Sequence, residues 1–362
     1  MTKVLTASFL LASAVGLAAQ APTFTSPAGF ATTEGATNHD YILASKIGLT
    51  FQQLDGTNRG NARVVKSIAW RRDGTGATNS AYTARTMEME VVMADTTVAY
   101  VSTTHANNYK NPPSVVFTKK MVNAPDWTTP PATPPSPWNL KLVYDTPWVY
   151  LGVDDFLWEL RVTQNSAVTG TTGLAYGFDF DYIGQAGATF STTATGVANG
   201  TGCLSTGMTA AYKLSGSLYT HPNRLRLALS ATGAPATTPV SVFLDGVDSN
   251  LSITGLCGVL HAVPTATFDL GTSTATGSVA TKTFDNLPYN SSYTGVVLHM
   301  QAVSIDAGQS GYPVTVSNGL KFTIAAPPTN LGTIARVYSY LSGATTTVPS
   351  QWTGGLITQF EY

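Results

Sequence analysis

Charged residues are scarce in this chain of 362 amino acids, since Asp, Glu, Lys and Arg together make up only 11% of it. The formal net charge is −1 and no basic cluster is present, which excludes an electropositive surface for nucleic acid. After the first 21 residues there is no apolar run of about 18 residues, so we expect no transmembrane helix. Thr, Ser, Asn and Gly replace the missing charge, a balance typical of an exported β-protein.

Recognisable catalytic patterns are also missing. The chain has five histidines, and neither a Gly-x-Ser-x-Gly elbow nor a Ser-His-Asp set can be identified by spacing. Gly74, Thr75 and Gly76 lack the third glycine and the strand-to-helix context of a dinucleotide loop. We therefore expect no catalytic residues and no cofactor.

Cysteine is nearly absent, with Cys203 and Cys257 as its two occurrences. In an exported protein an even count favours a disulfide, whereas two buried free thiols are the alternative. Neither cysteine has a Cys or His neighbour at ligand spacing, which argues against a metal site.

The first 21 residues have the pattern of a secretory signal peptide. Lys3 precedes an apolar run over residues 4–19, and small residues follow at the expected cleavage site. This pattern predicts a protein that is secreted to the extracellular space or the cell surface.

Period-two alternation is the strongest signal in the rest of the chain. In residues 86–93 one face of an expected strand carries Met87, Met89, Val91 and Met93. Residues 158–162, 224–229 and 320–324 alternate in the same way, and no helical period is sustained. The sequence predicts an all-β protein with two antiparallel β-sandwich modules, Ig-like or jelly-roll-like.

Composition suggests the domain boundaries. A Thr-, Gly- and Ala-rich stretch at residues 191–207 predicts a first module over residues 22–200 and a second, with the disulfide, over residues 201–328. Residues 329–362 form a C-terminal extension with strand-like alternation. We expect its strands to fold back on the second module, and donor-strand assembly with a neighbouring copy is the alternative.

Several segments carry a family resemblance. Residues 67–74, the strand through Met87 and Met93, and residues 147–160 resemble a family of secreted proteins of planctomycete bacteria. The second half, with Cys203, Cys257 and residues 317–320, resembles the module that often follows in that family. The resemblance implies a two-module β-sandwich protein. It carries over no functional residues, and this chain continues about 30 residues beyond the last shared strand.

Two acidic features are candidates for chemistry. Asp179 and Asp181 lie two residues apart, so on one face of a strand they would be about 6 to 7 Å apart, within the range of a glycosidase pair. Because Phe178, Phe180 and Tyr182 alternate with them, a surface or edge strand is the preferred interpretation. The oxygen-rich loop at residues 245–250 suits calcium, although it lacks the EF-hand spacing.

Aromatic residues suggest a binding surface around the proline-rich loop at residues 124–138. Trp127 and Trp138 are the candidates for an exposed indole on which a sugar ring stacks, whereas Trp148 and Tyr150 are expected in the core. We therefore predict a non-catalytic protein of the cell surface or extracellular matrix that acts by binding or assembly. The alternative is an exported carbohydrate-binding protein or hydrolase, so the expected partners are polysaccharide or further copies of the chain.

Overall fold

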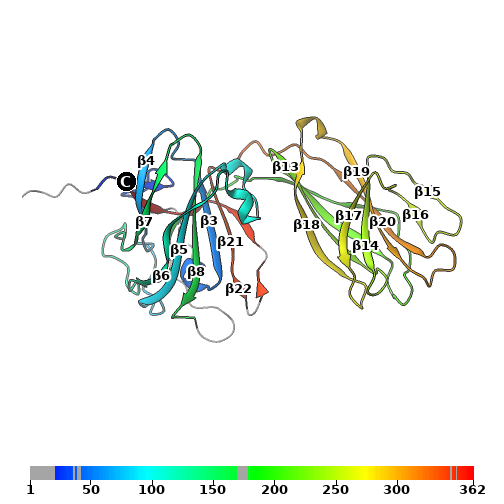
Figure 1. Ribbon diagram of the computed structural model, residues 1–362, viewed down its shortest axis with the longest axis horizontal. Coiled ribbons are helices and arrows are strands. Elements are labelled where there is room, and N and C mark those ends of the chain that lie inside the picture. The colour runs from blue at the N-terminus through cyan, green and yellow to red at the C-terminus, as the bar shows by residue number, and fades with distance from the viewer. Residues whose placement is uncertain are drawn as a thin grey trace, which may run out of the picture.

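The computed structural model describes residues 21–35, 37–38, 42–168, 178, 180–342, 345–347 and 349–362. Residues 1–20 of the expected signal peptide therefore lie outside the described residues. The described chain is all-β and forms two modules that lie side by side along the long axis of the molecule (Figure 1). Its short helical turns are α1 (Ile42–Ser45), η1 (Val98–Tyr100), η2 (His105–Asn108) and η3 (Ser291–Tyr293). No helix in these ranges has the length and hydropathy needed to cross a bilayer.

The first module is built from two main antiparallel sheets with smaller pieces at their margins. The larger sheet has the order β24 (Ser350–Thr353), β21 (Ile334–Ser339), β3 (Leu49–Asp55), β8 (Asp155–Asn165), β5 (Arg85–Thr96) and β6 (Ser114–Ala124). The facing sheet has the order β1 (Thr23–Ser26), β26 (Thr358–Glu361), β4 (Arg63–Trp70) and β7 (Leu140–Tyr150). The smaller pieces are β2 (Thr37–Asn38), β9 (Asp181–Ile183) and β25 (Gly355–Leu356) in one sheet, and β22 (Leu341–Ser342) with β23 (Thr345–Thr346) in another.

The alternating apolar residues make the core of the first module. The side chains of Met87, Met89, Val91 and Met93 are all 0% exposed, so the predicted register of β5 is confirmed. Trp148 and Tyr150 are also buried, as expected. The opposite face is not simply solvated, however. Glu159 on β8 is 1% exposed, because the segment around η2 covers this face and Tyr109 donates a hydrogen bond to its carboxylate.

The C-terminal extension belongs to the first module, so the expectation that it folds onto the second is wrong. β21 pairs with β3, and β26 lies between β1 and β4. Figure 1 accordingly shows the chain's C-terminus beside β4 and β7. Two of the extension's strands, β21 and β26, take interior positions in the two main sheets, and β24 forms the edge of the larger sheet beside β21.

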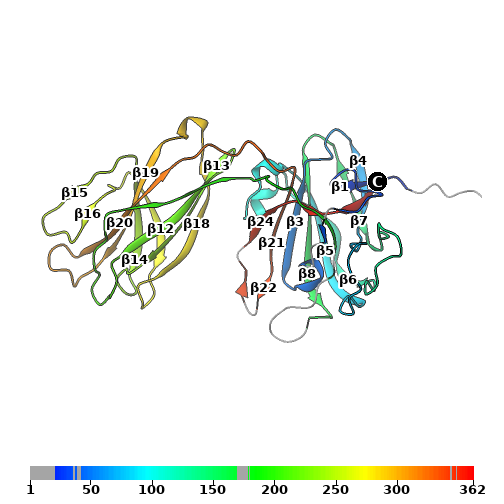
Figure 2. The same ribbon diagram turned by 180° about the vertical axis from the view of Figure 1, so that it is seen from behind.

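The second module is a sandwich of a four-stranded and a five-stranded antiparallel sheet. The first has the order β10 (Thr192–Thr195), β12 (Lys213–Thr220), β13 (Arg224–Thr232) and β18 (Val279–Pro288). The second has the order β11 (Val197–Asn199), β20 (Val314–Thr323), β19 (Val297–Ile305), β14 (Pro239–Asp245) and β17 (Ala266–Thr272). The hairpin of β15 (Leu251–Ser252) and β16 (Val259–Leu260) lies at the end away from the first module (Figures 1 and 2). Because β10 and β11 pair within this module, it begins earlier than the expected residue 201.

A disulfide joins Cys203 to Cys257, with 5.5 Å between their Cα atoms. Cys203 is anchored by backbone hydrogen bonds from its N–H to Val316 and from Tyr212 to its carbonyl. Cys257 lies between β15 and β16, so the bond ties this hairpin to the start of the module. In the chain-entropy view a closed loop of this size stabilises the fold by about 4 kcal/mol.

Candidate functional site

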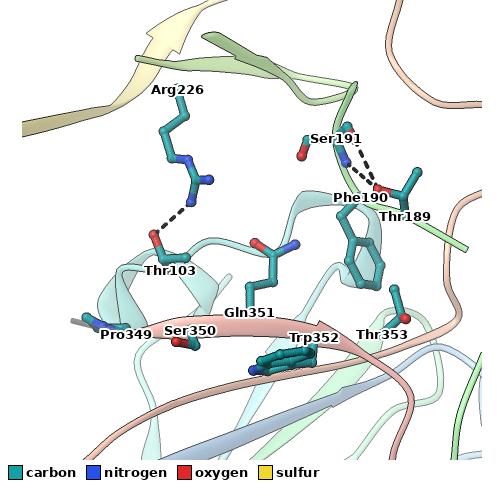
Figure 3. A pocket seen from close by; sticks show the side chains of 10 residues that line it. All are labelled: Thr103, Thr189, Phe190, Ser191, Arg226, Pro349, Ser350, Gln351, Trp352 and Thr353. Carbon is teal, nitrogen blue, oxygen red and sulfur yellow. Dashed lines mark hydrogen bonds between the residues drawn. The ribbon is translucent and has the colours of Figure 1, made fainter. Parts of the chain in front are cut away.

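A cleft of about 490 Å³ lies where the two modules meet, and we call it the junction cleft (Figure 3). Four separate segments of the chain build it. Their side chains are Thr103 after η1, Thr189, Phe190 and Ser191 in the segment that crosses to the second module, Arg226 on β13, and Pro349, Ser350, Gln351, Trp352 and Thr353 at β24. Both modules therefore contribute to one site.

Strand β24 supplies one wall because it is the edge strand of the larger sheet. It pairs with β21, and the register sets Gln351 opposite Val337 and Trp352 opposite Arg336. Val337 is part of a small core that also contains Phe190. This packing fixes the wall, while the indole of Trp352 at its edge stays 50% exposed.

Contacts around Arg224 hold the two modules together next to the cleft. Its guanidinium donates hydrogen bonds to the carbonyl oxygens of Tyr100 and Val101 in the first module. It also forms an ion pair of 3.1 Å with Asp285, whose carboxylate accepts a 2.7 Å hydrogen bond from the Ser102 hydroxyl. Arg224 lies on the polar side of the alternating pattern in residues 224–229, a side that is often solvent-facing. It is buried because the first module covers that side.

Arg226 faces the cleft two residues further along β13. It lies opposite Tyr219 on β12, with the guanidinium carbon 4.0 Å from the centre of the tyrosine ring. In Figure 3 its side chain extends toward Thr103, to which Nη1 donates a long hydrogen bond of 3.4 Å. The Nε–H is buried and has no acceptor among the described residues.

The charge near Arg226 is positive. Burial, together with the positive charges of Arg224 and Arg226, lowers the pKa of His221 to about 3, so the imidazole is neutral at neutral pH. Asp285 supplies a carboxylate, which already pairs with Arg224. Two guanidinium groups and one carboxylate leave a local charge of about +1 at the junction cleft.

Some polar side chains on the other walls of the cleft have hydrogen-bond donors and acceptors that no other described residue uses. Within the described ranges, the side chains of Ser350 and Gln351 make no hydrogen bond. Figure 3 shows the Gln351 amide rising from β24 into the space between Thr103 and Phe190. The Thr189 hydroxyl is used locally, donating to the Ser191 carbonyl at 3.0 Å. The cleft thus offers an amide, hydroxyls and a cation to a ligand, and the indole of Trp352 lies at its margin on the other side of the edge strand β24.

The tryptophans expected to form a ligand surface lie elsewhere. Trp127 is 2% exposed, packs against Phe178 and Phe180, and donates from Nε1 to Asn139 at 2.8 Å. The expectation that Trp127 offers an exposed face is wrong, because the proline-rich loop turns this ring inward. Trp138 is half-buried with the Arg71 guanidinium 4.4 Å from its ring centre, and its role stays a prediction.

The candidate carboxylate pair is placed only in part, because Asp179 lies outside the described residues. Asp181 is 1% exposed, forms an ion pair of 2.6 Å with Arg71 and accepts a 2.8 Å hydrogen bond from the Gly35 N–H. Burial raises the pKa of Asp181, and the charge of Arg71 opposes that shift. The neighbouring Phe178 and Phe180 belong to the core, so the expected surface strand is wrong and Asp181 holds the fold together.

The acidic loop at residues 245–250 uses its carboxylates internally. Asp248 pairs with the Nδ1 atom of His261 at 3.0 Å and accepts hydrogen bonds from Asn199 and from the Asn250 N–H. Among the described residues, no group of three or more His, Cys, Asp or Glu side chains could hold a metal ion. Calcium binding at this loop therefore stays a prediction without structural support.

The junction cleft was not identified from sequence. Trp352 lies in the C-terminal extension, 126 positions from Arg226 by subtraction of their numbers, and no local pattern links them. The one available signal was an aromatic residue among Ser, Gln and Thr in the extension that departs from the family resemblance. No protein-family model, curated protein or solved structure matches the chain.

Proposed function

We propose that this chain is a secreted, non-catalytic binding protein of the cell surface or extracellular matrix, and that its junction cleft binds polysaccharide. The observation that carries the proposal is the set of groups at the cleft. The Gln351 amide faces the cleft without a hydrogen-bond partner, and the half-exposed indole of Trp352 lies on the other side of the same edge strand. Sugar rings stack on indoles, and their hydroxyls bond to such polar groups.

The compartment supports this function. A disulfide such as that between Cys203 and Cys257 persists in oxidising surroundings outside the cytoplasm, where polysaccharide is abundant. The leader-like residues 1–21 and the resemblance to secreted planctomycete proteins point the same way. The other candidate, assembly by donor-strand exchange, has less support because the extension's strands pair within their own chain.

Binding to a panel of insoluble polysaccharides tests the proposal. We expect the full mature chain to bind at least one of them, and Trp352→Ala to weaken that binding about tenfold, because an aromatic contact contributes on the order of 1.4 kcal/mol. Tyr312→Ala is the matched control. This ring is 51% exposed but lies beside Gly255, near the hairpin far from the cleft, so its loss should change nothing.

Three results would contradict the proposal. These are no binding to any polymer, equal binding by the wild type and Trp352→Ala, or equal losses in the two variants. Release of reducing sugar ends during the same incubation would instead support the hydrolase alternative.

A further inference from the structure

The junction cleft carries a cation that the protein does not neutralise. Of the two arginines beside it, Arg224 is fully engaged by Asp285 and by two carbonyl groups of the first module. Arg226 has no ion-pair partner among the described residues, and its hydroxyl contact with Thr103 is long at 3.4 Å. A partly buried guanidinium without a counterion attracts an anion more strongly than an exposed one, because water screens it less.

The position of Arg226 is set before any ligand arrives. The backbone pairing of β12 and β13 sets Tyr219 directly across from it, and the ring lies 4.0 Å from the guanidinium carbon. Cation–π contact and the Thr103 hydroxyl restrain the side chain while leaving N–H donors on its terminal nitrogens. Such a planar fork matches the paired oxygens of a carboxylate or a sulfate.

The groups around Arg226 neither neutralise its charge nor attract an anion in its place. His221 is neutral at neutral pH, and Asp285 is already paired with Arg224. The whole chain has a net charge of −1, so no overall positive field draws anions to it. Any preference for an anionic ligand must therefore come from the cleft itself.

We infer that the junction cleft binds an acidic sugar, with a carboxylate or sulfate group on Arg226 and a sugar ring on Trp352. This inference rests on the proposed function and adds the ligand class. Gln351 extends into the cleft on the side of Arg226 and bonds to the sugar hydroxyls, and the sugar chain continues around the free edge of β24 to the Trp352 indole, which lies on the other side of that strand (Figure 3). A neutral glycan of the same size lacks the contact with Arg226 and binds more weakly.

Titration of the full mature chain with three soluble polymers tests the inference. The polymers are polygalacturonate, which carries carboxylates, dextran sulfate, which carries sulfates, and unmodified dextran as the neutral match. We expect at least one acidic polymer to bind tenfold or more tightly than dextran. The stronger of the two identifies the anionic group, and added salt should weaken its binding.

Substitutions test whether Arg226 is the source of the preference for acidic polymers. Arg226→Gln should reduce the acidic binding about tenfold or more, and Arg226→Lys, which keeps the charge but not the fork, should retain part of it. Lys321→Gln removes the same charge from an exposed site on β20 and should leave binding unchanged. Thermal unfolding of each variant separates loss of binding from loss of fold.

The results distinguish failure of the acidic preference from failure of the polysaccharide-binding function. If all three polymers bind equally and Trp352→Ala weakens them while Arg226→Gln does not, the acidic preference is wrong but the polysaccharide function stands. If Lys321→Gln weakens binding as much as Arg226→Gln, the attraction is diffuse and the inference is wrong. If neither these polymers nor the insoluble panel binds, both proposals fail.

Discussion

Deletion of residues 329–362 is expected to unfold the first module while the second stays folded. The extension inserts β21 beside β3 and places β26 between β1 and β4, so its loss splits one sheet and strips the edge from another. Ile334, Leu356 and Phe360 are each 0% exposed, and Val337 is equally buried. Each such side chain contributes about 1.5–3 kcal/mol, so together they approach the whole stability of a domain.

Limited proteolysis followed by mass spectrometry measures this effect. Cleavage should spread through residues 22–190 of the truncated chain and spare the second module. Phe360→Ala removes only one buried side chain of the extension and should lower the free energy of unfolding of the first module by about 3–5 kcal/mol. Thr346→Ala, at an exposed position of the same extension, is the control and should be nearly silent. A truncated chain that stays a stable monomer and merely stops forming oligomers would support donor-strand exchange and contradict this account.

Asp181→Asn is expected to destabilise the first module by about 3–5 kcal/mol, because it leaves the buried guanidinium of Arg71 without a counterion. Both side chains of this ion pair are almost fully shielded, at 0% and 1% exposed. Chemical denaturation measures the loss. Asp154→Asn is the matched control, since its ion pair with Lys110 is half-exposed and should contribute less than about 1 kcal/mol.

This comparison also separates a structural Asp181 from a catalytic one. A carboxylate kept for catalysis is often replaced by its amide with little loss of stability. If Asp181→Asn unfolds at the same denaturant concentration as the wild type, the structural role is wrong. The carboxylate pair with Asp179 then becomes a candidate again.

The sequence predicted strands and their inner faces well, because a buried face requires an apolar residue at every second position. Met89 on β5 and Phe322 on β20 are buried as this rule demands. The same rule says nothing about what covers the other face. Glu159 and Arg224 both lie on the polar side of the alternating pattern of their strands, yet both are buried by segments from elsewhere in the chain.

The site could not be predicted for a related reason. Trp127 and Trp138 were predicted to form a ligand surface because they lie close together around one proline-rich loop. Proximity along a chain, however, does not determine whether a side chain is exposed. Trp352 and Arg226 line the same cleft only because β24 returns to the first module after the whole second module has been formed. A long-range pairing of this kind leaves no periodic trace in the sequence.

Hydrogen exchange of the full mature chain, with and without a saturating acidic oligosaccharide, tests the central claim most directly. If the junction cleft is the binding site, protection should increase in residues 189–191, 224–227 and 349–353, which come from both modules and the extension. The hairpin at β15 and β16 should not change. Protection confined to the proline-rich loop around Trp138, or to the acidic loop at residues 245–250, would contradict the account.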